Sequence, residues 1–116
     1  LESFGRYERD LFVDGMNAAT EGLRGNEKLD AALQFIVQYQ KTYSGVRVID
    51  IEPEAVLAQL PSVVPTMRAR LQKLLSGPNA EVKAATAIRI AVSHYLVPSD
   101  DTEQLLAQLR HAVGLR

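Results

Sequence analysis

Cysteine is absent from this chain of 116 residues. Without a thiol, the protein cannot form a disulfide, bind a metal through thiolates or use a cysteine nucleophile. An excess of charge of one sign is also lacking, because 13 Lys and Arg residues balance 14 Asp and Glu residues and leave a formal net charge of -1. A surface so close to neutral does not attract nucleic acid or an anionic membrane, since both are polyanions.

Long apolar runs and a targeting segment are missing too. No apolar stretch approaches the roughly 18 to 20 residues that a membrane-spanning helix needs. We therefore expect no membrane partner. The chain begins at Leu1, with neither an initiator Met nor the pattern of a signal peptide. Such a start fits a piece of a longer protein, and processing would produce it as well.

Catalytic and metal-binding patterns are equally scarce. The only two histidines are His94 and His111, and local spacing fixes no acidic partner for either. His111 lies near a predicted helix C-terminus, where a cation interacts favourably with the helix dipole. Two isolated histidines do not indicate a metal site, and the seven glycines form no phosphate-binding loop. We expect no enzymatic activity, no catalytic residue, no metal and no cofactor.

What the sequence does contain is helix-forming pattern. Apolar residues recur at steps of three and four over residues 4–23, which predicts an amphipathic helix that Gly22 and Gly25 end. Asn26 is a suitable N-cap for a second helix that runs to about Tyr43. Residues 46–51 alternate apolar and polar side chains, which would permit a short strand. We interpret them as a short helix or an irregular connector, because a single strand has no obvious partner.

The middle of the chain carries two prolines. Glu52 and Pro53 predict a helix start, which continues until Pro61, and the helical pattern resumes after Pro65. Pro61 removes the donor to the Leu57 carbonyl, so a kink here would open space between helices and favour a cavity. The prolines could equally start and stop separate helices.

The helix predicted over residues 80–97 is apolar nearly all the way round. Asn79 is expected to cap it and Pro98 to stop it. A helix with two apolar faces must be covered on both. It is therefore either the central rod of a monomeric bundle or a rod covered by its own domain on one side and by a partner on the other.

The last helix follows after a short turn. Asp100 and Glu103 have the spacing of a capping box, and Gly114 is the expected C-terminal stop. Two such terminal helix pairs meeting about a twofold axis would give the self-complementary interface of a symmetric dimer. The fold class expected is all-α, an antiparallel bundle of five to six helices whose last two form a dimer-interface hairpin. The candidate interface residues lie on these two helices: Val82, Ala85, Arg89, Ile90, Ser93, Leu105, Leu109 and Ala112.

A second candidate site would lie between the other helices. Flexible methionines and flat aromatic rings are suited to the wall of an apolar pocket, although the same residues could form ordinary core. Gln40 continues an apolar stripe, so its amide needs a partner, which a ligand, a water, a neighbouring backbone or bulk solvent could supply. The candidate pocket residues are Phe12, Met16, Phe35, Tyr39, Gln40, Leu57, Val64, Met67 and Leu71.

The order of helices resembles a known family. Residues 85–101 read ATAIRIAVSHYLVPSDD and resemble the penultimate helix and turn of the C-terminal domain of TetR-family transcriptional regulators. Residues 61–75 are similar to the central helix of that domain, with a basic, leucine-rich end in which Arg68, Arg70 and Lys73 read as a solvated face. Residues 1–23 are similar to its long connecting helix. The resemblance covers essentially the whole chain, but it is one of pattern rather than of invariant motif.

The resemblance implies a bacterial, cytoplasmic, homodimeric repressor whose C-terminal domain encloses a small, mostly apolar effector. Ligand binding would shift the first helix and release DNA from an N-terminal helix-turn-helix head. We expect residues 1–116 not to include that head, since Phe4-Gly5 and Asp10-Leu11-Phe12 only echo its end, with a spacing one residue too long. We expect residues 1–116 to be a single effector-binding and dimerisation domain that contacts DNA only through a domain not present here. The alternative is an all-α protein-protein interaction module without a small-molecule ligand.

Overall fold

Five helices make up the described part of the chain, which comprises residues 2–42, 51–98 and 101–115 of a computed structural model. The side chains of residues 2–9 and 41–42 lie outside this description. The helices are α1 (Glu2–Thr20), α2 (Gly25–Thr42), α4 (Pro53–Gln72), α5 (Ala80–Leu96) and α6 (Thr102–Ala112). No described residue is in a strand, which confirms the all-α prediction for this part of the chain. The sequence alone did not decide between a strand, a short helix and a connector for residues 46–51, and residues 46–50 lie outside the described ranges.

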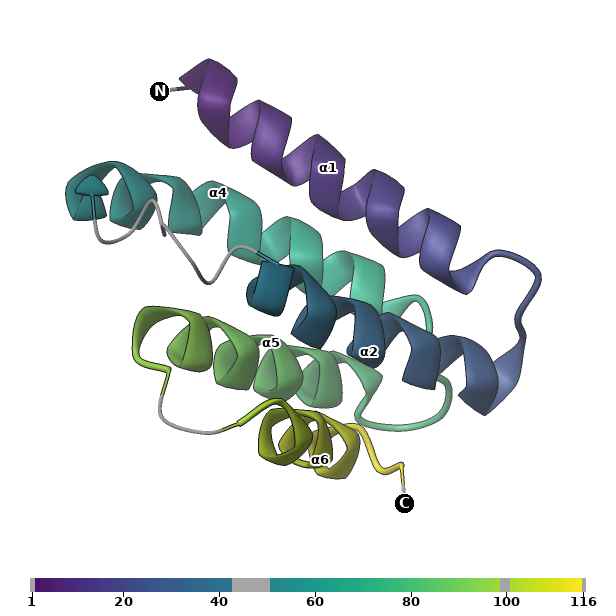
Figure 1. Ribbon diagram of the computed structural model, residues 1–116. Coiled ribbons are helices and arrows are strands. Elements are labelled where there is room, and N and C mark those ends of the chain that lie inside the picture. The colour runs from purple at the N-terminus through teal and green to yellow at the C-terminus, as the bar shows by residue number, and fades with distance from the viewer. Residues whose placement is uncertain (1, 43–50, 99–100, 116) are drawn as a thin grey trace.

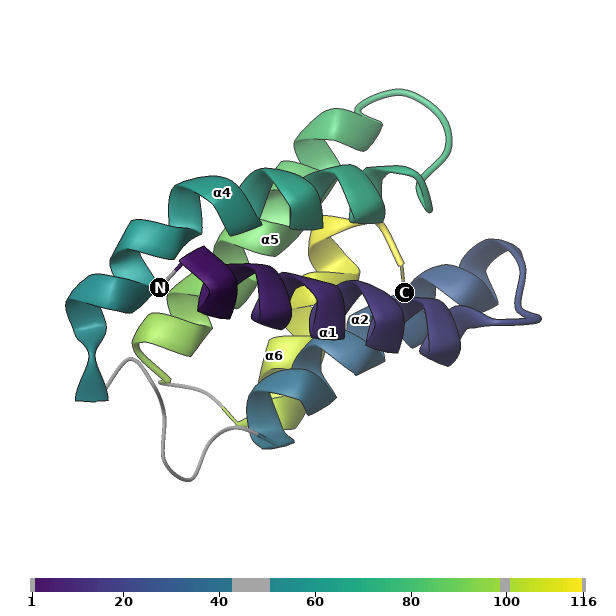
Figure 2. The same cartoon turned by 90° about the horizontal axis from the view of Figure 1, so that it is seen from above.

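The helices are arranged in three layers (Figure 1). α1 packs on α2 and α4, and these two helices separate it from α5 and α6. α5 contacts α4, α6 and, over a shorter stretch, α2. Figure 2, seen from above, also places α5 and α6 side by side. One long side of α5 is therefore not covered by the other described helices.

The core lies between the layers. Its largest fully buried side chains are Leu33 of α2, Leu71 of α4, Ile88 of α5 and Leu105 and Leu109 of α6. The buried side of α5 also carries small residues, namely Ala84, Ala87 and Ala91. Small side chains let neighbouring backbones approach closely, so α5 can contact three other helices at once.

Three helix ends differ in detail from the prediction. α1 ends at Thr20, and Gly22 follows with a φ of 78° in the left-handed region that glycine tolerates. Asn79 precedes α5 with a φ of 67°, and its side chain makes no capping hydrogen bond, because such a bond needs extended backbone at the cap. The predicted side-chain cap is therefore wrong. α2 begins at Gly25, one residue before the predicted cap.

The capping box of α6 lies one residue later than predicted. Asp101 is the N-cap, and its Oδ1 accepts a hydrogen bond of 2.8 Å from the Gln104 backbone N–H. The Asp101 backbone N–H in turn donates to Gln104 Oε1 at 3.4 Å. Because the helix starts at Thr102, Glu103 belongs to its first turn and does not close the box.

The prolines do not divide α4, which is one helix from Pro53 to Gln72. Pro53 is in the first turn, as predicted, while Pro61 and Pro65 are inside the helix. Both inner prolines are exposed. Leu57 is exposed as well, and its carbonyl has no helical donor because Pro61 lacks a backbone N–H. Water can bind the carbonyls left without a donor on this exposed side, so the helix can continue through both prolines.

Within the described ranges, no helix combines the length and the apolar character that crossing a membrane would require.

Candidate functional site

Three of the predicted pocket residues, on α1 and α2, pack their aromatic rings against one another. The Phe12 ring lies 5.5 Å from the Phe35 ring and 5.5 Å from the Tyr39 ring, and the last two are 5.7 Å apart between centroids. Their tilted and edge-to-face orientations are favourable for aromatic pairs. Gly15 makes this packing possible, because a Cβ on that residue would lie 2.5 Å from Phe35 Cζ.

The Gln40 amide has two protein partners. Its Nε2 donates a hydrogen bond of 2.8 Å to the Ala91 carbonyl of α5, and its Oε1 lies 3.0 Å from His94 Nδ1. Of the partners considered from the sequence, a neighbouring backbone is therefore one that the structure provides. The amide connects α2 to α5 and does not require a ligand to satisfy it.

The other predicted pocket residues are dispersed. Met16 and Leu71 are buried in the core, and Met67 packs against it half-buried. Leu57 is 51% exposed, so it is not the wall of an enclosed pocket. Val64 does line a hollow, but this lies on the α5 side of α4.

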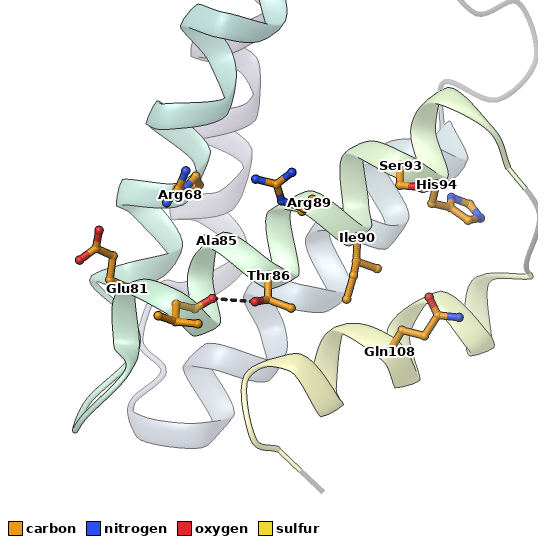
Figure 3. Close-up of a pocket in the computed structure, with 10 residues that line it drawn as sticks. Arg68, Glu81, Ala85, Thr86, Arg89, Ile90, Ser93, His94 and Gln108 are labelled. Atoms are coloured by element: carbon orange, nitrogen blue, oxygen red, sulfur yellow. Dashed lines mark hydrogen bonds between the residues drawn. The ribbon is translucent and has the colours of Figure 1, made fainter.

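Among the described residues, the outer side of α5 is hollowed. A groove of about 470 Å³ runs along it, between Arg68 of α4 and Gln108 of α6 (Figure 3). Eight residues of α5 line this groove in pairs, one pair per turn: Glu81, Val82, Ala85, Thr86, Arg89, Ile90, Ser93 and His94. Val82 is 63% exposed, one of four exposed large aliphatic residues in the described part of the chain, with Ile51, Leu57 and Val97.

A second hollow of about 420 Å³ adjoins the groove on the α4 side. The two share four residues, which are Arg68, Ala85, Arg89 and Ser93. The remaining wall of the second hollow is aliphatic and consists of Val64, Val92, Leu96 and Val97. We call this second hollow the α4–α5 hollow.

The predicted interface residues divide into two groups. All five on α5 line the outer groove: Val82, Ala85, Arg89, Ile90 and Ser93. Leu105 and Leu109 of α6, by contrast, are 1% and 0% exposed within a single chain, because they face α2 and α5. They are core residues and present no surface to a second copy. Ala112 is half-buried and packs against the same core.

Some charged side chains of the described residues form ion pairs and others do not. Asp30 of α2 and Arg110 of α6 form a two-point ion pair, with Nε to Oδ1 at 2.7 Å and Nη2 to Oδ2 at 3.1 Å. The hydrogen bonds from Arg110, opposed by partial burial and assisted by a bond from Gln34, lower the pKa of Asp30. Among the described residues, neither Arg68 nor Arg89 has a hydrogen bond or an ion pair.

Sequence reasoning missed two features of this surface. Arg68 was assigned to a solvated basic face, and its place in both hollows depends on how α4 packs on α5. Gln108 of α6 also reaches the groove, although no pattern in α6 marks it. Within the described residues, no group of three or more acidic or histidine side chains is arranged to hold a metal ion.

Comparison of this chain with protein-family models, with curated proteins and with solved structures finds no match.

Proposed function

We propose that this chain is the homodimerisation and effector-sensing domain of a TetR-like transcriptional repressor, and that the outer side of α5 joins two copies. The observation that carries the proposal is the groove along α5, which is lined by all five α5 residues that the sequence assigns to an interface. The exposed Val82 supports it, since an apolar side chain in a shallow groove is stabilised when a partner covers it.

The order of residues along the groove suits a symmetric pair. A twofold axis through the midpoint of Ala87 and Ile88 would set two α5 helices antiparallel and map the eight groove residues onto one another. The residues brought opposite each other are Glu81 and His94, Val82 and Ser93, Ala85 and Ile90, and Thr86 and Arg89. The face from Glu81 to His94 is about 20 Å long at about 1.5 Å per residue.

The chemistry of these pairs is complementary. The small Ala85 would receive the larger Ile90 of the second copy, as neighbouring ridges and grooves do in helix packing. The acidic Glu81 would lie opposite the imidazole of His94. Each contact would occur twice, because the interface is the same patch on both copies.

Sensing would use the layers of the fold. α4 contacts α5 on one side and α1 on the other, so a ligand held against α4 could favour one packing of α1 over another. DNA release would follow only in a regulator that also carries the helix-turn-helix head, which is not among these residues. No step of this function is catalytic.

Sedimentation equilibrium at micromolar concentrations tests the proposal. The wild-type chain should be a dimer, and Val82→Glu should shift it to a monomer because a carboxylate would be buried at the seam. Leu57→Glu is the matched control, since it also introduces an acid at an exposed aliphatic residue but on α4, away from the groove. A monomeric wild type, or equal weakening by both variants, would refute dimerisation through α5.

A further inference from the structure

Two unpaired guanidinium groups lie in the same two hollows. Arg68 extends from α4 and Arg89 from α5, and both line the outer groove and the α4–α5 hollow. In Figure 3 the Arg89 side chain extends from α5 toward α4, the helix that carries Arg68. Glu81 also lines the groove but forms no ion pair with either arginine within the described residues. The hollow therefore has a positive end that the described residues do not neutralise.

Apart from Ser93, the rest of the α4–α5 hollow is apolar. Val64 lies one turn before Arg68 on α4, and Val92 and Leu96 follow Arg89 along α5. Val97 at the far end is 68% exposed. The volume of about 420 Å³ is within the range of small-molecule sites.

We propose that the α4–α5 hollow binds an amphipathic carboxylate. The carboxylate group would lie between Arg68 and Arg89, because guanidinium groups match its planar geometry and can donate two hydrogen bonds at once. The alkyl chain would run along the valines and Leu96 toward Val97. From Arg89 to Leu96 the helix axis spans about 10 Å, which suits a medium-length chain.

This inference rests on the proposed sensing role for its biological meaning, but binding itself is a property of one chain. Val82, the residue whose change is expected to separate the copies, lines the outer groove and not the α4–α5 hollow. Val82→Glu can therefore separate the copies without changing the lining of the α4–α5 hollow, whereas Arg68 and Arg89 line both sites.

Isothermal titration with decanoate, below its micelle concentration, tests the proposal. Wild type and Val82→Glu should both bind one decanoate per chain. Arg68→Gln and Arg89→Gln should each weaken binding about tenfold or more, through loss of a charge-assisted hydrogen bond. Lys73→Gln is the matched control, because it removes a cation from the same end of α4 but outside the hollow. Decanol, which has the same chain without the charge, should bind more weakly by a similar factor.

The outcomes separate the two ideas. Saturable binding that both arginine variants weaken, in variants whose circular dichroism and melting temperature match wild type, supports the site whether or not the protein dimerises. Absence of saturable binding to wild type overturns it. Equal loss in Lys73→Gln overturns it as well, since the anion would then respond only to general charge.

Discussion

The space between α1 and α2 and the outer side of α5 are opposite in character. In the first, three aromatic rings fill the volume beside Gly15, and the nearby Gln40 amide has partners on α5. In the second, two hollows remain, with an exposed Val82 and two arginines that no described residue pairs. We therefore propose the outer side of α5 as the functional side, because binding stabilises groups that the fold leaves open and gains little from groups already satisfied.

This difference is also the reason why we propose a different place for the effector than the sequence suggested. Aromatic and methionine side chains were expected to wall a pocket, yet Phe12 and Met16 are buried in the protein's own core. The α4–α5 hollow, by contrast, has an open volume of about 420 Å³ in which a ligand could lie. The substitutions below test whether the interior is filled and the α5 side is open.

The largest effect is expected where the interior is most completely buried. Leu109→Ala should lower the free energy of unfolding by about 2 to 5 kcal/mol, because it leaves a cavity in the core. Leu57→Ala, at an exposed aliphatic residue, should change it by less than about 0.5 kcal/mol. Urea denaturation at two protein concentrations measures both. A loss for Leu109→Ala that vanishes on dilution would instead place that residue between copies.

A smaller loss is expected at Gly15. Alanine in place of a mid-helix glycine usually stabilises by about 0.5 to 1 kcal/mol. Here the added methyl group collides with the Phe35 ring, so Gly15→Ala should destabilise by about 1 to 3 kcal/mol. Adding Phe35→Leu should recover part of the Gly15→Ala loss, which a double-mutant cycle of thermal unfolding would show. Simple additivity would mean that the interior is not filled as described.

Removal of the Gln40 amide should cost less again. Gln40→Leu deletes the hydrogen bond to the Ala91 carbonyl and the partner of His94 Nδ1, so it should destabilise by about 0.5 to 1.5 kcal/mol. Gln72→Leu, at the exposed end of α4, is the control and should have little effect on chemical denaturation. A stabilised Gln40→Leu variant would contradict the view that the protein satisfies this amide internally.

The smallest effect is expected for the ion pair between α2 and α6. Arg110 lowers the pKa of Asp30, so this carboxyl stabilises the fold at pH values above its unfolded pKa of about 3.9. The contribution is lost as the pH falls through the lower pKa of the folded state. Its size should be about 0.2 to 1 kcal/mol, because the Arg110 and Asp30 side chains are 36% and 28% exposed.

Unfolding of wild type and of Asp30→Asn should be measured at pH 7 and at pH 2 to 3. The acidic condition is about one to two units below the unfolded pKa. The two proteins should differ at neutral pH and converge as the pH falls through the lowered pKa of Asp30, because the protonated carboxyl resembles the amide. Asp14→Asn, at an exposed residue of α1, should not show this pH-dependent difference. A difference that persists unchanged in acid would exclude the ion pair as its cause.

The periodicity of apolar residues predicted where helices lie but not the residues at which they begin and end. The three- and four-residue steps predicted helices α1, α2 and α5 to within a few residues, because burying an apolar stripe largely determines where a helix forms. The inner prolines were misleading, since their effect depends on which side of α4 meets water. The capping box was placed one residue early because Asp100 and Asp101 are chemically alike and only the helix start distinguishes them.

The site was predictable only where it lies on one helix. The α5 residues of the groove share a face at helical spacing, so sequence alone could group Val82 with Arg89. The part that Arg68 contributes depends on the packing of α4 against α5, which no local pattern encodes. Leu105 and Leu109 were assigned to the interface because a stripe of leucines has the same pattern whether it meets its own chain or another.

The central claim, that two copies meet through antiparallel α5 helices, is tested most directly by cysteine cross-linking, since the natural chain has no cysteine. One preparation carries Val82→Cys and the other Ser93→Cys, the two residues that the proposed axis brings together. After mixing under oxidising conditions, the account predicts disulfide-linked heterodimers between the two variants in preference to either homodimer. Efficient homodimers of each variant without heterodimers would indicate parallel helices, and an absence of any cross-link would contradict the α5 interface itself.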